Sequence, residues 1–209
     1  RYSISDDKVY YTFQDSHHRI WVCTYGGGLN LMVERNGKTV FINKNNELKS
    51  YPGNDLYQSV RQIVEDKNHT LWVATTDGLL AFDADFKSAS KIRFNNFRQN
   101  NNTTVVDNDI YSLLKDSRGN IWISIFGCGL NKVAFYNENT GRIKLTPLTA
   151  NNQQSNIVST VTEDKNHRLW FTSENGLSCI DEDNGNIHTY GFLDGFLRSK
   201  IEDNTSISL

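Results

Sequence analysis

Residues 14–29, QDSHHRIWVCTYGGGL, carry the pattern that decides the fold, because it returns three more times along the 209-residue chain. The later copies are EDKNHTLWVATTDGL at 65–79, KDSRGNIWISIFGCGL at 115–130 and EDKNHRLWFTSENGL at 163–177. Each copy places an Asp six residues before a Trp and a Gly-Leu pair six or seven residues after it. Four copies in register indicate a repeat protein. The repeated residues are Asp15, Asp66, Asp116 and Asp164; Trp21, Trp72, Trp122 and Trp170; and Gly28, Gly78, Gly129 and Gly176.

Each repeat predicts a four-stranded antiparallel meander. The first strand is expected at 9–14, 60–65, 110–115 and 158–163, where β-branched and aromatic residues are frequent. The Asp opens a tight turn, the second strand carries the Trp, and the Gly permits a turn or bulge before the third strand. A fourth strand is predicted at KTVFI (38–42), KIRFNNF (91–97) and RIKLTPL (142–148). A helical repeat is excluded, because no stretch of the sequence has helical periodicity.

Repeats of about 50 residues with four strands are typical of β-propeller blades. We therefore predict an all-β chain that is a single propeller segment, with repeats at approximately 9–58, 59–108, 109–156 and 157–209. A Trp ring can fill the gap between twisted sheets, and its indole N–H needs a hydrogen-bond partner.

Composition excludes several classes of protein. The chain has 22 Lys and Arg against 24 Asp and Glu, so no basic excess is present to bind a nucleic acid. No apolar run approaches the ~20 residues that a membrane span needs, and no signal peptide follows Arg1. The three cysteines, Cys23, Cys128 and Cys179, are too few and too scattered to predict a disulfide framework or a zinc site.

The repeated polar residues are expected to be scaffold. An active site is needed once, whereas the Asp and Trp occur in every repeat, so no catalytic residue is predicted. GGGLN at Gly26–Asn30 and GCGLN at Gly127–Asn131 lack the Lys-Ser/Thr of a phosphate-binding loop. Cys128 lies in one of these turns, and no neighbouring His or Lys predicts a lowered thiol pKa.

Histidines recur in the turn after the repeat Asp. His18, His69 and His167 follow that Asp by three residues, and Gly119 takes the same place in the third repeat. This exchange predicts a left-handed turn conformation, which Gly adopts freely and His tolerates. Turns on separate blades are expected to lie beyond the ~2 Å bonds of zinc. We therefore expect no metal site, no cofactor and a solvated His17.

Ligand contacts are expected at positions that are equivalent in the repeat but differ in chemistry. Five residues before each repeat Asp lie Tyr10, Arg61, Tyr111 and Ser159. If the first strands are innermost, these residues gather near the channel mouth, with Lys8, Asp109 and Asn156 close by. Aromatic rings beside Arg and amide donors suit a sugar or an acidic sugar. Tyr25 and Phe126, after the Trp strand, form a second candidate pair.

The repeated segments resemble the two-component regulator propeller repeat, from Val9 to Asp194. GGGLN and GCGLN match its variable turn, and DGL and NGL match its shorter form. The resemblance implies a piece of the periplasmic sensor region of a hybrid two-component histidine kinase, whose relatives have two seven-bladed propellers. It also implies an oligosaccharide from a degraded glycan as ligand, homodimerisation, and no enzymatic activity in this segment.

Several alternatives stay open at this stage. Four blades cut from a larger ring would expose apolar end faces, so the chain is expected to close as four blades, pair with a second copy or contact the remainder of its sensor. A propeller enzyme, for instance a lyase or glycosidase, would need non-repeating His, Glu or Tyr residues at one mouth. A protein-interaction propeller would show broad apolar patches on one face.

Overall fold

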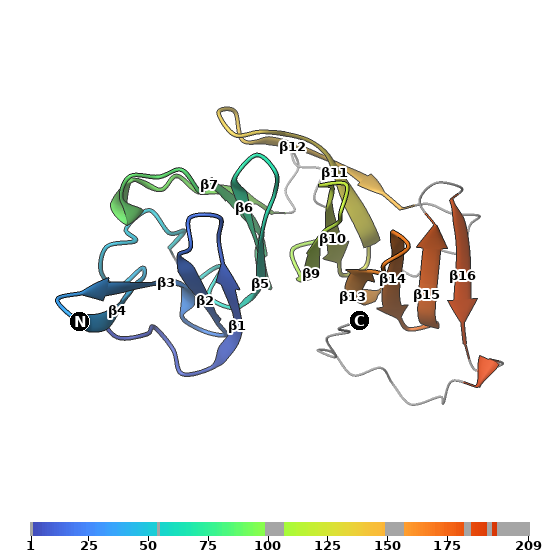
Figure 1. Ribbon diagram of the computed structural model, residues 1–209, viewed down its shortest axis with the longest axis horizontal. Helices are drawn as coiled ribbons and strands as arrows, with labels where there is room; N and C mark the ends of the chain where they lie inside the picture. Colours follow the sequence, from blue (N-terminus) through green and yellow to red (C-terminus); the bar gives the residue numbers. More distant parts are fainter. Residues whose placement is uncertain are drawn as a thin grey trace.

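The computed structural model describes residues 2–53, 55–98, 107–148, 157–181, 185–191 and 194–195. Its strands form four four-stranded antiparallel sheets, each built from one repeat with the strands in chain order (Figure 1). The predicted all-β architecture of four-stranded units is confirmed. The strands of the first two sheets are β1 (Val9–Gln14), β2 (Ile20–Thr24), β3 (Gly28–Arg35), β4 (Lys38–Ile42), β5 (Val60–Glu65), β6 (Thr70–Thr75), β7 (Gly78–Asp83) and β8 (Asn95–Phe97). Those of the last two are β9 (Ile110–Lys115), β10 (Ile121–Ile125), β11 (Gly129–Asn137), β12 (Arg142–Pro147), β13 (Val158–Glu163), β14 (Arg168–Ser173), β15 (Gly176–Asp181) and β16 (Asn186–Tyr190).

The four sheets follow one another as blades of an arc, in which β1, β5, β9 and β13 lie side by side (Figure 1). Each of these first strands contacts the first strand of the next sheet. The first strand of every blade therefore lies on the inner side of the arc, next to the first strand of its neighbour.

Apolar cores fill the spaces between consecutive blades. Trp21 of the first blade is fully buried and packs edge-on against Phe82 of the second, with ring centroids 5.3 Å apart. Trp72 packs in the same way against Tyr136 of the third blade, at 4.8 Å. Trp122 lies in the cluster that joins the third and fourth blades. Each of these three indoles thus contacts the blade that follows it, which is how the repeated Trp holds the stack together.

The fourth strands differ in part from the prediction. In the second blade the strand is shorter than KIRFNNF, because Ala89–Lys91 form a 3-10 turn, η1, and pairing begins only at Asn95. The fourth blade has a fourth strand, β16, for which the sequence carried no clear signal. None of the described segments is a helix with the length and apolarity that a membrane crossing requires.

Candidate functional site

The repeat Asp organises the turn between the first two strands of every blade. Asp15 is 3% exposed, and its Oδ1 accepts hydrogen bonds from the backbone N–H groups of His17 and Arg19 at 3.0 and 2.9 Å. Its Oδ2 accepts the indole N–H of Trp21 at 2.9 Å. The same indole bond recurs at 3.0, 2.9 and 2.8 Å in the pairs Trp72–Asp66, Trp122–Asp116 and Trp170–Asp164. These carboxylates are occupied by structural hydrogen bonds, which is a scaffold role.

The histidine three residues after the repeat Asp has the left-handed backbone that the sequence predicted. His18, His69 and His167 have φ of 61°, 63° and 61°, and Gly119 has φ of 81° at the same place. The backbone requirement explains why only His and Gly occur there in this chain. The backbone requirement does not account for the side chains, however, since two of these three imidazole rings also make contacts between blades.

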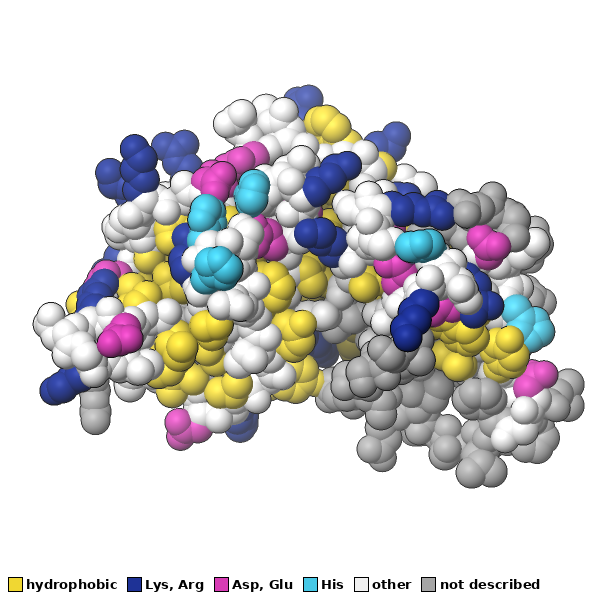
Figure 2. Space-filling view, viewed as in Figure 1, with side chains coloured by type: hydrophobic (Ala, Val, Ile, Leu, Met, Phe, Trp, Pro, Cys, Tyr) yellow, Lys and Arg dark blue, Asp and Glu magenta, His cyan; other side chains and the backbone are white. Residues whose placement is uncertain are grey.

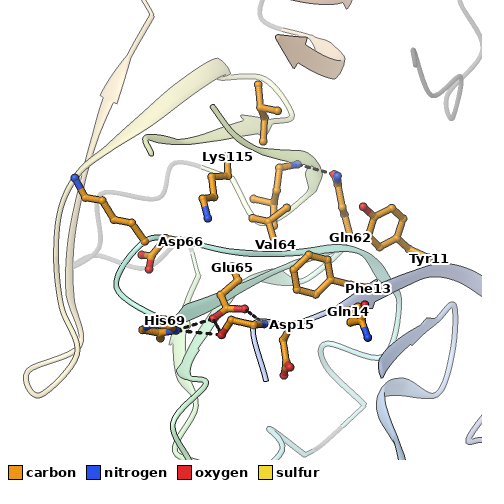
Figure 3. Close-up of a pocket in the computed structure, with 14 residues that line it drawn as sticks. Tyr11, Phe13, Gln14, Asp15, Gln62, Val64, Glu65, Asp66, His69 and Lys115 are labelled. Carbon is orange, nitrogen blue, oxygen red and sulfur yellow. Dashed lines mark hydrogen bonds and ion pairs between the residues drawn. The ribbon is translucent and has the colours of Figure 1, made fainter. Parts of the chain in front are cut away.

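A Ser–Glu–His latch links the first blade to the second. Glu65 is 7% exposed and accepts the backbone N–H and the hydroxyl of Ser16, both at 2.6 Å. His69 Nδ1 lies 3.0 Å from Glu65 Oε1 and 3.1 Å from Ser16 Oγ (Figure 3). The third and fourth blades are joined by the same latch, in which Ser117 takes the place of Ser16, Glu163 that of Glu65 and His167 that of His69.

The latch has the residue types of a hydrolase triad but not its geometry. In a triad one ring nitrogen of the His contacts the Ser and the other contacts the acid. Here Ser16 Oγ and Glu65 Oε1 both lie at Nδ1 of His69, and the Ser hydroxyl donates to the carboxylate. The latch therefore lacks the Ser–His–acid order of a triad, and it connects two blades.

The boundary between the second and third blades carries different residues at the latch positions. Lys67 stands where Ser16 and Ser117 stand, while Lys115 and Gly119 replace the Glu and the His. Lys67 passes over Gly119, where its Cδ would lie 3.2 Å from a Cβ atom on that glycine. The repeats thus alternate between two types. The first and third repeats have Ser after the repeat Asp and the longer glycine turn, whereas the second and fourth have the sequence EDKNH and the shorter turn. The sequence reasoning missed this alternation, although the aligned copies contain it.

The four positions expected to contact ligand share a backbone feature. In each first strand the pairing register shifts by one residue, between Val9 and Tyr11, between Val60 and Gln62, opposite Ser124 and Ile125, and between Val158 and Thr160. The extra residues at these β-bulges are Tyr10, Arg61, Tyr111 and Ser159, which we call the bulge row. A bulge re-aims one side chain out of the regular alternation of a strand and is frequent beside binding sites.

The structure brings the aromatic candidates together in two pairs. Tyr10 and Tyr25 have ring centroids 5.6 Å apart, and Tyr111 and Phe126 are 5.9 Å apart. Tyr10, Tyr25 and Phe126 are 39%, 38% and 40% exposed, so each pair presents aromatic surface to solvent. Both pairs combine a bulge residue with the turn after the second strand, and both occur in the first type of repeat. In Figure 2 hydrophobic side chains gather low on the half that holds β1–β8.

Arg61 lies at the bulge between these pairs and is already bound within the protein. Its guanidinium donates to the Asp109 carboxylate and, at 3.0 Å, to the carbonyl of Ile110 in the next blade. It also lies 4.6 Å from the ring centre of Tyr111. Arg61 therefore positions Tyr111, and its charge is partly compensated. Asn156, named with this group from sequence, lies outside the described residues.

A cavity of about 650 Å³ opens along the inner strands of the first three blades (Figure 3). Its walls include Tyr11, Phe13, Gln62, Val64 and Leu113. Most acidic groups on its rim are satisfied, because Asp15 and Asp66 bind indoles and Glu65 belongs to the latch. Within the described residues no hydrogen bond or ion pair engages the ammonium groups of Lys67 and Lys115, which also line it. The cavity offers apolar wall and two cations.

The three thiols are poor nucleophiles. Burial raises the pKa of Cys23, of Cys128 and of Cys179, so each is protonated near neutral pH. His17 is exposed, and its Nε2 also lies 2.6 Å from Asp85 Oδ1 of the second blade. The turns of neighbouring blades also approach more closely than the sequence reasoning assumed. Among the described residues, one group of three potential metal ligands gathers there, formed by His17, His69 and Asp85.

Comparison with known families finds one model that matches two parts of the chain. The family model described as two component regulator propeller matches residues 55–77 and 104–127. These segments include the Asp–Trp turns of the second and third blades. Among curated proteins, a sequence search finds no significant match.

Solved structures share the fold. The extracellular domain of BT3049 from B. thetaiotaomicron, assigned as a hybrid two component system, superposes with a TM-score of 0.67 at 22% identity, over 92% of this chain and 24% of its own. That of BT4673 from the same organism gives 0.51 at 20% identity, over 91% and 28%. Virginiamycin B lyase from Staphylococcus aureus gives 0.56 at 16% identity, over 91% and 58%. This chain thus spans about a quarter of the two extracellular domains.

Proposed function

We propose, from the premise that this chain is built of two component regulator propeller repeats, that it is a non-enzymatic ligand-sensing segment of an extracytoplasmic sensor, and that it binds a glycan-derived oligosaccharide at the bulge row. One observation carries the binding site: every first strand bulges at the position where the side chains differ in chemistry. The scaffold positions have the same residue in every repeat, whereas these four positions share a backbone bulge and differ in their side chains.

The chemistry of the bulge row fits a carbohydrate. The first and third blades offer exposed aromatic pairs, on which the C–H faces of a sugar ring can stack. Arg61 and Ser159 stand at the equivalent positions in the second and fourth blades, where Arg61, bound to Asp109, holds its charge beside the Tyr111 ring. Rings and polar groups thus alternate around the mouth, which suits an oligomer that has both apolar faces and hydroxyl or carboxylate oxygens.

Calorimetric titration of the chain with a panel of neutral and uronic-acid oligosaccharides tests the proposal. We expect saturable binding without release of product, and at least a tenfold weaker affinity, about 1.4 kcal/mol, after Tyr10→Ala or Tyr111→Ala. Phe135→Ala is the matched control, because Phe135 is 52% exposed on β11 and away from the mouth. Absence of binding, or equal losses in the control, would contradict the assigned site.

The lyase alternative rests on fold likeness alone, at 16% identity to virginiamycin B lyase. The same titrations decide it when the mixtures are analysed for new products by chromatography. Unsaturated or shortened oligosaccharides would replace the sensor proposal with an enzyme.

A second copy of the chain is the proposed protein partner. Trp170 stacks on Tyr190 of its own blade at 5.9 Å, and it is more exposed than Trp21, Trp72 and Trp122, which contact a following blade. An accessible indole of this kind favours association. Sedimentation velocity at increasing protein concentration measures it, and a monomer throughout would refute the dimer.

A further inference from the structure

We propose that His17, His69 and Asp85 form a zinc site that ties the first blade to the second. The three side chains come from three separate segments, namely the turn between β1 and β2, the turn between β5 and β6, and the residues that follow β7. Their ligand atoms all lie within 4.8 Å of one another. The site lies at the opposite end of β1 from Tyr10, so it is distinct from the proposed ligand mouth.

The backbones that carry the three ligands are bonded to one another. Ala84 N–H donates to the His69 carbonyl at 2.7 Å, and Arg19 Nη2 donates to the Ala84 carbonyl at 2.6 Å. Asp85 N–H is held by Asp83 Oδ1 at 2.8 Å. These bonds fix the position of Asp85 relative to both turns before any ion arrives, which lowers the cost of assembling the site.

The latch holds His69 as a metal ligand is usually held. Its Nδ1 is occupied by Glu65 and Ser16, which leaves Nε2 as the ring nitrogen available to an ion. Histidine ligands of zinc commonly donate their second ring N–H to a carboxylate, which fixes the tautomer and makes the ligand more basic. Glu65 is a buried carboxylate in that position, and it is not one of the three proposed ligands.

Two imidazoles and one carboxylate suit zinc among the common divalent ions. His17 Nε2 already lies 2.6 Å from Asp85 Oδ1, and the His17 and His69 ring centres are 6.1 Å apart. Bonds of about 2.0–2.2 Å require these atoms to shift by roughly an ångström, which rotation of exposed side chains allows. All three side chains are about half exposed, so an ion can reach them, and water would complete the coordination. Figure 2 shows histidine side chains gathered on this face of the half that holds β1–β8.

The boundary between the third and fourth blades provides an internal comparison. Ser117, Glu163 and His167 repeat the latch there, but Arg118 stands at the position of His17. The latch therefore forms without a second histidine beside it. His17 is an addition at the first boundary, and replacing it with Arg copies an arrangement that this fold already contains.

Zinc titration of the chain by calorimetry tests the proposal, with Co²⁺ as a spectroscopic probe. We expect one Zn²⁺ per chain and the visible absorption of four-coordinate Co²⁺. His17→Arg and Asp85→Asn should abolish both signals, and Glu65→Gln should weaken binding by about 10–100-fold. His18→Asn is the matched control, because it removes a neighbouring exposed histidine that lies outside the cluster while keeping a residue that tolerates its φ of 61°.

Two results would overturn the proposal. One is the absence of stoichiometric zinc binding by the unsubstituted chain. The other is zinc binding that does not depend on the cluster, seen as an affinity that His17→Arg leaves unchanged or that His18→Asn reduces to the same extent. Either outcome would mean non-specific binding to surface histidines. Circular dichroism of each variant shows whether it is folded, so that unfolding of a variant is not mistaken for the loss of a zinc ligand.

Discussion

In each repeat a single carboxylate accepts the hydrogen bonds that fix the turn and the Trp ring. Asp116 is 2% exposed, and it accepts the backbone N–H and the side-chain amide of Asn120, both at 2.7 Å, and the indole of Trp122 at 2.9 Å. One residue thereby closes the turn and sets the orientation of the ring that packs against the next blade. The Asp116 carboxylate thus links the local turn to the packing between blades.

We expect Asp116→Asn to destabilise the chain by about 2–3 kcal/mol, because an amide nitrogen placed at Oδ2 would face the indole donor. Urea denaturation measures the loss. In the Trp122→Phe background the donor is gone, so the second substitution should cost clearly less. Additive losses in this double-mutant cycle would show that the indole bond contributes nothing.

A pH effect is predicted at the equivalent residue of the fourth blade. Burial acts to raise the pKa of Asp164, but hydrogen bonds from Trp170 and Arg168 outweigh it and hold that pKa well below its ordinary value. The unfolded chain therefore binds this proton more readily than the folded chain. The resulting stabilisation is complete above about pH 4, the ordinary pKa of Asp, and is lost as the pH falls further.

Urea midpoints measured between pH 7 and pH 2.5 would show this effect. The unsubstituted chain should lose stability below about pH 4 more steeply than Asp164→Asn, which has no proton to take up at this position. Parallel pH profiles would contradict the prediction. Asp164→Asn itself should be less stable at pH 7, because it lacks the charged acceptor.

At the scale of the strand, the repeat glycine of the second and fourth blades sets how closely the third and fourth strands approach. Gly78 opens β7 with φ of 135°, and a Cβ atom there would lie 2.4 Å from the carbonyl oxygen of Phe97 in β8. Gly176 repeats this closeness to the Tyr190 carbonyl at 2.3 Å. A side chain at either place would force the backbones apart and break the pairing of the outer strand.

Gly78→Ala should therefore cost more than about 3 kcal/mol or prevent folding, because both the backbone angle and the contact oppose it. Gly37→Ala is the matched control. Gly37 also has a positive φ, 69°, but nothing lies within 4 Å of the place that a Cβ atom would take, so it should cost only about 1 kcal/mol. Thermal unfolding compares the two, and equal losses would mean that the contact with Phe97 is unimportant.

The strands show which parts of the molecule could be predicted from sequence. Asp, Trp and Gly recur at fixed spacing within one repeat, so the turns, the first three strands and their order could be placed. The latch could not, because Ser16 and Glu65 are 49 residues apart and meet only when blades stack. The bulge row was chosen for its varied chemistry, and its shared backbone irregularity depends on pairing that no single strand reveals. Tyr10 and Tyr25 were named in separate groups, and only the folded chain brings their rings together.

For the molecule as a whole, the boundaries between blades are of two kinds. Latches close the first and the third boundary, whereas the second carries Lys67 and Lys115 at the latch positions and is closed by an apolar core and by other hydrogen bonds, among them those of Arg61 to Asp109 and Ile110. Two cations near each other add no attraction there. The four blades thus form two latched pairs that meet at a boundary without a latch.

Installing a latch at this boundary tests that description. Lys67→Ser, Lys115→Glu and Gly119→His together supply the three missing groups, and the Ser also removes the lysine stem that would touch the new His. We expect the melting temperature to rise by about 2–8 °C, from one or two added hydrogen bonds to a charged acceptor. Lys67→Ser alone should change it little. A triple variant no more stable than this control would show that the latch does not stabilise a boundary.

Alternation of two kinds of unit also has a consequence for counting. In a closed ring, two types of repeat can alternate at every boundary only when the number of blades is even. If the pattern continues through the seven-membered ring that the resemblance implies, parity requires one seam at which two units of the same kind adjoin. Whichever residues occupy that seam, they cannot supply the Ser, the Glu and the His of a latch together.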